Sequence, residues 1–162
     1  MKILFPLAVS LLLAGCGFQL RGTADLPFET VYVPNATAGI ALDLKRNIQA
    51  GTRAKVLDSP KDAQAVMQFT EETRAKEILS LTGTGRVREF QLRYRVGFRV
   101  HDGKGGDFVP LNTIQLTRDV SFNDSEILAK EAEEQLLFRD MQTDMVSQIM
   151  RRLAAAQKPA PQ

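Results

Sequence analysis

The chain has one cysteine, Cys16, and one histidine, His101, and these are its most reactive side chains. A lone cysteine cannot form an internal disulfide, so the folded core has to supply the stability. His101 stands beside Asp102 without a second histidine, a cysteine or a cluster of carboxylates nearby, whereas metal sites and catalytic triads need several such groups together. We therefore predict no catalytic residue, no bound metal and no enzyme activity; a periplasmic hydrolase that uses His101 is the enzyme alternative.

The surroundings of Cys16 predict a different chemistry for its thiol. Lys2 gives a positive start, Ile3–Leu13 is a mostly apolar run, and small residues follow. This is the layout of an export signal, and the run is shorter than the roughly 20 residues of a membrane-spanning helix. The "LAGC" motif resembles the bacterial lipobox, whose cysteine receives a diacylglyceryl group and, after cleavage, an N-acyl chain. We expect residues 1–15 to be a signal peptide and Cys16 to carry these covalent lipids, with no other cofactor.

The residue after Cys16 bears on the final location of the protein. Gly17 stands where an aspartate would resemble an inner-membrane retention signal. The lipobox resemblance therefore implies an outer-membrane lipoprotein that faces the periplasm, with residues 16–27 as its lipidated N-terminal tether. Several acyl chains are needed for stable anchoring, because each buried methylene contributes only about 0.8 kcal/mol.

The mature chain then shows the strands and helices that must position its polar residues. Phe28–Val33 is rich in β-branched and aromatic residues, which predicts a strand. Ile40, Leu44 and Ile48 recur every four residues, which predicts a helix with one apolar face. The further predicted elements are a short strand at 54–58, a strand at 63–82, a tight turn at 83–85, a strand at 90–100, a loop at 102–107, a strand at 114–122 and a helix at 125–156.

Alternation along the strand at 90–100 predicts a sheet with one covered face and one wet face. Its even-numbered residues from Phe90 to Val100 are apolar, and the odd-numbered ones are mostly polar. The last helix, with Asp124 or Ser125 as the expected N-cap, has an apolar stripe to cover that sheet: Leu137, Met141, Met145, Ile149 and Leu153. The element order predicts an α/β (α+β) two-layer sandwich, in which two helices lie on one face of a mostly antiparallel, mixed sheet of four to five strands. We expect a single domain at 28–156 and a disordered tail at 157–162.

Arginines crowd one arm of the predicted hairpin: Arg86, Arg88, Arg93, Arg95 and Arg99. Guanidinium groups bind phosphate oxygens through paired hydrogen bonds, so this row suits a phosphorylated partner. The other interpretation is a solvated face that is neutralised across the ladder by Glu71, Glu77, Glu89 or Asp119. The net charge of only +2 and the lack of aromatic residues on this face argue against nucleic acid as a partner.

Three stretches together resemble the lipopolysaccharide-assembly lipoproteins of the LptE (RlpB) family. They are "LAGCGFQLRG" at 13–22, "REFQLRYRVGFRV" at 88–100 and "ILAKEAEEQLLFRDMQTDMVSQIMRRL" at 127–153. The resemblance covers nearly the whole mature chain and implies that the domain is LptE-like. It implies a monomer that plugs the lumen of the large outer-membrane β-barrel LptD in a one-to-one complex. Such a plug supports assembly of the barrel and helps deliver lipopolysaccharide to the outer leaflet.

The resemblance also implies lipopolysaccharide-binding residues. One basic residue of the family lies early in the last helix, and it corresponds to Lys130 in the "LAK" motif here. The other lies near the strand-strand turn, where this chain has Gly83, so Arg86 and Arg88 are the candidates to replace it. The alternative from another binding class is a general periplasm-facing lipoprotein that holds a soluble polyanion or a peptide.

Overall fold

The computed structural model describes residues 25–159, apart from the side chain of Asp124. The elements along the chain are β1 Thr30–Tyr32, α2 Gly39–Gly51, β2 Lys55–Leu57, β3 Ala65–Leu81, β4 Val87–His101, β5 Asp107–Ser121, a 3-10 turn at Asp124–Glu126 and α3 Ile127–Ala154. The order predicted from the sequence is therefore confirmed. Among residues 25–159, no helix combines the length and the apolarity needed to cross a bilayer.

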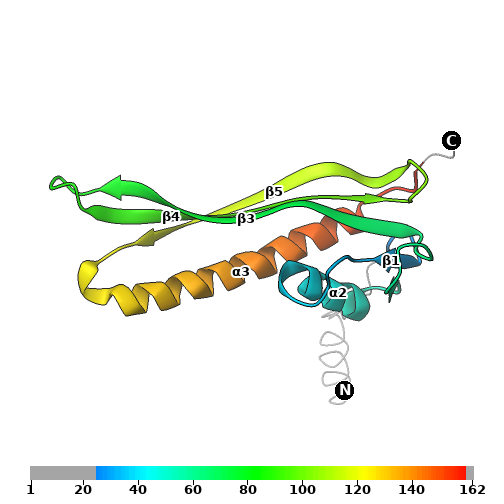
Figure 1. Ribbon diagram of the computed structural model, residues 1–162, viewed down its shortest axis with the longest axis horizontal. Helices are drawn as coiled ribbons and strands as arrows, with labels where there is room; N and C mark the ends of the chain where they lie inside the picture. The colour runs from blue at the N-terminus through cyan, green and yellow to red at the C-terminus, as the bar shows by residue number, and fades with distance from the viewer. Residues whose placement is uncertain (1–24, 160–162) are drawn as a thin grey trace, which may run out of the picture.

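The strands form one five-stranded mixed sheet in the order β2-β1-β3-β4-β5. Strand β1 runs parallel to β2 and β3, while β3, β4 and β5 are antiparallel neighbours. Both helices lie on the same side of this sheet, and the β3–β4 hairpin extends away from the short strands (Figure 1). The predicted two-layer sandwich is confirmed.

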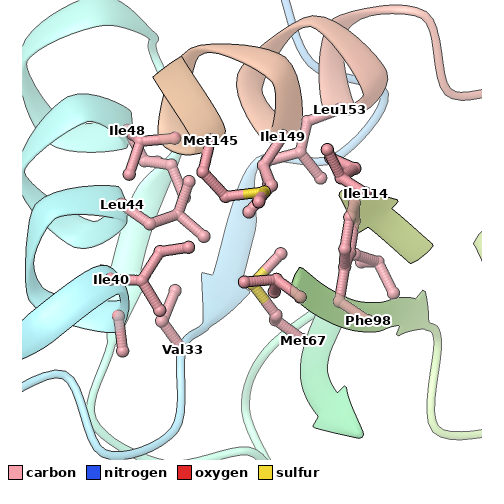
Figure 2. Close-up of a cluster of buried hydrophobic side chains, with 14 of the residues drawn as sticks. Val33, Ile40, Leu44, Ile48, Met67, Phe98, Ile114, Met145, Ile149 and Leu153 are labelled. Atoms are coloured by element: carbon pink, nitrogen blue, oxygen red, sulfur yellow. The ribbon is translucent and has the colours of Figure 1, made fainter. Parts of the chain in front are cut away.

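The core lies between the two helices and the covered face of the sheet. Alternate β4 residues from Leu92 to Val100 are fully buried, as the alternation predicts. In α2, Ile40, Leu44 and Ile48 are buried as well, and they face the last turns of α3 (Figure 2). The stripe of α3 is fully buried from Met141 onward, whereas its first member, Leu137, is only half-buried. The sandwich is therefore closed around α2 and less filled towards the start of α3.

A β-bulge in β3 changes which side chains face the helices. Phe69 pairs with Phe98 and Glu71 with Gly97, so Thr70 is an extra residue in β3. A Cβ on Gly97 would lie 2.6 Å from Thr70 Oγ1, so the bulge needs a glycine there. Because side chains alternate along a strand, the extra residue exchanges the two faces of β3 beyond Thr70.

Among the differences from the sequence-based expectations, the start of β5 and the N-cap of the last helix have a clear physical reason. Strand β5 begins at Asp107 rather than at Ile114, and it contains Pro110. This is possible because β5 is an edge strand, where a residue without a backbone N–H interrupts no second ladder. The N-cap predicted at Asp124 or Ser125 is wrong. The chain first forms the 3-10 turn, whose cap is Asn123, and its side chain accepts a hydrogen bond from the Ser125 backbone N–H at 3.2 Å.

After α3 the chain runs back across the end of the β4–β5 hairpin. A Cβ on Gly106 would lie 2.5 Å from the Cβ of Pro159, so these two residues are in close contact. Residues 160–162 of the predicted tail lie outside the described residues, and disorder of the tail stays a prediction.

Candidate functional site

The uncovered face of the sheet holds a ladder of polar side chains from neighbouring strands. Three of the five arginines singled out in the sequence lie in this ladder and have partners: Arg93 with Glu77, Arg95 with Glu71, and Arg99 with Gln68. The first pair is a bidentate fork with distances of 3.0 and 2.8 Å, and Arg95 Nε lies 3.3 Å from its carboxylate. Carboxylates of β3 therefore neutralise two of these three arginines, as the second interpretation of the sequence predicts, whereas Arg99 donates to the neutral amide of Gln68.

The other two arginines lie at the end of the hairpin and differ from this row. Arg86 and Arg88 are exposed, and among the side chains that the structure describes neither guanidinium forms an ion pair. The backbone of Arg86 closes the turn, since its carbonyl accepts from Thr82 N–H at 2.7 Å. Arg88 is an extra residue in β4, because Ser80 pairs with Glu89 and Leu81 with Val87. These two positive charges are thus available to an anionic ligand.

Lys130 lies on the first turn of α3 and reaches the last residue of β5. Its ammonium donates to Ser121 Oγ at 3.0 Å and to Glu133 Oε2 at 2.9 Å. The next residue, Phe122, donates its backbone N–H to the carbonyl of Arg88 at 2.9 Å. Lys130 and Arg88 therefore flank the end of β5 from α3 and β4. Only 17% of the Lys130 side chain is exposed, so an anion that binds it has to displace Glu133.

Polar bridges replace apolar packing between the outer half of β3 and α3. Lys76 Nζ lies 2.6 Å from Glu134 Oε2, and Arg74 donates to Gln142 Oε1 at 2.5 Å. The bulge at Thr70 is the reason, because it turns the even-numbered residues of outer β3 towards the helix. The sequence does not predict these bridges, because the apolar residues before Thr70 are odd-numbered and place the odd-numbered residues of β3 on the helix side of the sheet.

Tyr94 is the most strongly perturbed ionisable group of the described chain. Its side chain is fully buried, and its hydroxyl donates to Glu72 Oε1 at 2.7 Å. Burial, and then the hydrogen bond to Glu72, raise the pKa of Tyr94 far above its usual value. The Arg74 guanidinium stacks at 4.8 Å from the centroid of the Tyr94 ring. Tyr94 therefore stays neutral and acts as a structural hydrogen-bond donor.

His101 and Asp102 organise the β4–β5 turn. His101 Nδ1 accepts from the Gly103 N–H at 3.0 Å, and Asp102 Oδ1 accepts from the N–H groups of Lys104 and Gly106 at 2.7 and 2.9 Å. These backbone hydrogen bonds, that of Lys104 first, hold the pKa of Asp102 below its usual range. In the described part of the chain, no three His, Cys, Asp or Glu side chains gather as metal ligands would. Both side chains thus have turn-stabilising contacts.

Of the site residues predicted from the sequence, the structure brings Lys130 and Arg88 to one end of the sandwich and places Arg86 in the adjoining turn. Cys16 lies outside the described residues, so its lipidation stays a prediction. Sequence reasoning missed Ser121 and Glu133, the partners of Lys130. The spacing of Lys130 and Glu133 on one helix could have indicated their pair.

The chain is similar to proteins of one family in sequence and in structure. The family described as "LptE: Lipopolysaccharide-assembly" matches residues 28–153. The LPS-assembly lipoprotein LptE of Photorhabdus laumondii is 28% identical over 156 residues, which cover 94% of this chain and 84% of that protein. The LPS-assembly lipoprotein LptE of Yersinia pestis is also 28% identical to this chain. The match covers 94% of this chain and 74% of that protein.

Two solved structures share the fold. The solution structure of an uncharacterized lipoprotein B from Nitrosomonas europaea superposes with a TM-score of 0.74 at 45% sequence identity, and the match covers 86% of this chain and 91% of that one. The crystal structure of the rare lipoprotein B from Shewanella oneidensis superposes with a TM-score of 0.66 at 23% identity, over 78% of this chain and 92% of that one. The second likeness concerns the fold alone.

Proposed function

The chain belongs to the LptE lipopolysaccharide-assembly family, and from this premise we propose that it is the lipoprotein plug of the outer-membrane β-barrel LptD. In this role it supports assembly of the barrel and helps deliver lipopolysaccharide to the outer leaflet, without catalysing a reaction. It is a monomer in a one-to-one complex with the barrel. It is held at the outer membrane by the lipids on Cys16, faces the periplasm and inserts its domain into the barrel lumen.

The observation that carries this proposal is the uncovered sheet face. Its polar side chains pair between β3 and β4, as with Arg93 and Glu77, and Gln91 on β4 donates to Asp119 on β5. The lumen of a large outer-membrane barrel is polar, so a plug needs a hydrogen-bonding surface. Strands of 15 to 17 residues extend about 50 Å at roughly 3.3 Å per residue, which exceeds the ~25 Å apolar band of a barrel. The face is long enough to line the lumen from end to end (Figure 1).

The hairpin end is the part proposed to bind lipopolysaccharide. Arg86 and Arg88 are exposed, and Lys130 is held at the end of β5, where Phe122 donates to the Arg88 carbonyl. Guanidinium and ammonium groups are suited to the phosphates of lipid A. Because the contacts are near the surface, salt should weaken them, with a screening length of about 10 Å at 0.1 M.

The test is a paired assay on the double variant Lys130→Glu/Arg88→Glu. Lipopolysaccharide binding should fall, while co-purification with LptD from detergent-solubilised outer membrane should persist. The matched control is Lys61→Glu/Lys104→Glu, which makes the same charge change at exposed positions beside the opposite end of the long strands. This control should bind lipopolysaccharide as the native chain does.

Each other outcome has a defined meaning. Unchanged lipopolysaccharide binding by the double variant would reject Lys130 and Arg88 as the site. Loss of the barrel complex alone would move these residues to the plug interface. A native chain that does not co-purify with the barrel but binds a soluble polyanion would favour the general lipoprotein instead.

A further inference from the structure

The hairpin end exposes an unusual amount of apolar side chain. Of the seven large hydrophobic side chains that are exposed in the described part of the chain, five lie on the hairpin arm or at the start of α3. Ile78 and Leu81 on β3 are 58% and 55% exposed, and Leu128 on α3 is 82% exposed. Single exposed apolar residues need no explanation, but a local group of them marks an interaction surface.

Part of this group continues the core of the sandwich beyond its closed half. Ile78 is the cross-strand partner of Phe90, and it lies two residues beyond Lys76, the partner of the buried Leu92. The Phe90 ring in turn meets Phe122 edge-to-face, with 5.2 Å between the ring centroids. We call the apolar residues of this region the hairpin strip: Ile78, Leu79, Leu81, Phe90 and Phe122. The strip thus begins at half-buried aromatic rings and ends at side chains that are open to solvent.

The charges at the tip of the hairpin are basic, while Glu89 beside Phe90 accepts a hydrogen bond from Ser80 Oγ at 2.5 Å. The segment 79–88, "LSLTGTGRVR", contains Arg86 and Arg88 but no acidic residue. The Arg88 carbonyl accepts from the N–H of Phe122, so the backbone of this basic residue lies beside the strip. An apolar strip bordered by exposed guanidinium groups is complementary to a molecule with phosphates next to hydrocarbon chains. A polar barrel wall would match only the charged part.

We infer that the hairpin strip binds the acyl chains of the lipopolysaccharide molecule whose phosphates are bound by Arg86 and Arg88. This inference rests on the proposed function and assigns the strip to the hydrocarbon part of the same ligand. The phosphate contacts position the lipid at the turn, and the strip then covers apolar surface that would otherwise face water. Acylation of the ligand should therefore matter as much for affinity as its charge.

The experiment compares two ligands on the full, lipid-anchored chain in detergent. The first is native lipopolysaccharide, and the second is chemically deacylated lipopolysaccharide, which keeps its phosphates. In the double variant Ile78→Thr/Leu81→Thr, affinity for the acylated ligand should fall about 10- to 30-fold, as expected when two half-exposed side chains no longer gain apolar contacts. Affinity for the deacylated ligand should not change. Threonine is β-branched, and strands favour β-branched residues.

The matched control is Leu111→Thr, because Leu111 is 63% exposed on β5, away from the hairpin end. It should bind both ligands normally. Native affinity of Ile78→Thr/Leu81→Thr for the acylated ligand would overturn the inference, as would an equal loss for both ligands. Loss of LptD co-purification with unchanged lipid binding would also overturn it and assign the strip to the barrel.

A second variant separates the inference from the proposed function. Arg86→Glu/Arg88→Glu should weaken binding of both ligands, since both carry the phosphates. If it binds deacylated lipopolysaccharide like the native chain, the proposed phosphate site fails. A loss limited to the acylated ligand in Ile78→Thr/Leu81→Thr would still support the strip in that case.

Discussion

Replacing Glu133 by glutamine should strengthen the binding of lipopolysaccharide. The Lys130 ammonium is 2.9 Å from Glu133 Oε2 and 3.0 Å from Ser121 Oγ, so its nearest anion is already part of the protein. A phosphate that binds Lys130 has to compete with this carboxylate. Glu133→Gln removes the competing charge and keeps the shape of the side chain.

The size of the effect follows from the exposure of the pair. The Glu133 side chain is 45% exposed, so the pair belongs with surface ion pairs, which contribute about 0.2–1 kcal/mol. Since about 1.4 kcal/mol corresponds to a tenfold change, Glu133→Gln should raise the affinity about 1.4- to 5-fold. The gain should shrink at 1 M salt, where the screening length is only about 3 Å.

The assay is a titration of the full chain with lipopolysaccharide at low and at high salt. The matched control is Glu131→Gln, an exposed residue of the same helix that makes the same change in net charge. An equal gain in both variants would mean that only net charge matters and would refute the competition at Lys130. The reasoning would also fail if Lys130→Gln weakened binding while Glu133→Gln left it unchanged.

Three further predictions test the core, its buried hydroxyl and the anchor. Ile149→Ala removes a fully buried side chain and should lower the free energy of unfolding by about 2–5 kcal/mol. Leu136→Ala, at a 52% exposed position of the same helix, should lower it much less. Equal denaturation midpoints for the two variants would contradict the packing of α3. The folded state keeps the Tyr94 proton to higher pH than the unfolded state does, so the free energy of unfolding should fall above about pH 10. This decline should be weaker in Tyr94→Phe, and urea unfolding at several pH values measures the difference. Cys16→Ser should abolish acylation and leave uncleaved or mislocalised precursor; mass spectrometry that finds a native mature N-terminus without acyl chains would disprove lipidation.

Most of the fold could be predicted from the sequence because its signals are local. The alternation from Phe90 to Val100 and the four-residue spacing from Met141 to Leu153 reflect the geometry of a strand and of a helix. The structure buries both sets, apart from the half-buried ring of Phe90. The N-cap of the last helix was missed because several neighbouring polar residues could fill that role. The backbone path forms a 3-10 turn first, which Asn123 caps, and makes Glu126 the N-cap of α3.

The candidate site was less predictable, because its contacts join residues from different elements. The basic residues Lys130, Arg86 and Arg88 were found from type and position. The sequence did not predict that their surroundings differ. Lys130 is bound by Ser121 and Glu133, while the two arginines are exposed. Which carboxylate meets which base depends on the strand register and on how α3 crosses the sheet.

The sequence by itself determined the alternation of apolar and polar residues, the order of the elements and the placement of its basic residues along the hairpin. Only the tertiary structure decided which face each residue of outer β3 occupies, because the extra residue Thr70 is accommodated by Gly97 on the neighbouring strand. That bulge turns Lys76 and Ile78 towards the helix side of the sheet and Glu77 towards Arg93 on the other. A strand repeats every two residues, so one inserted residue exchanges its faces, and the glycine that makes room for it lies on another strand, 27 residues further along the sequence.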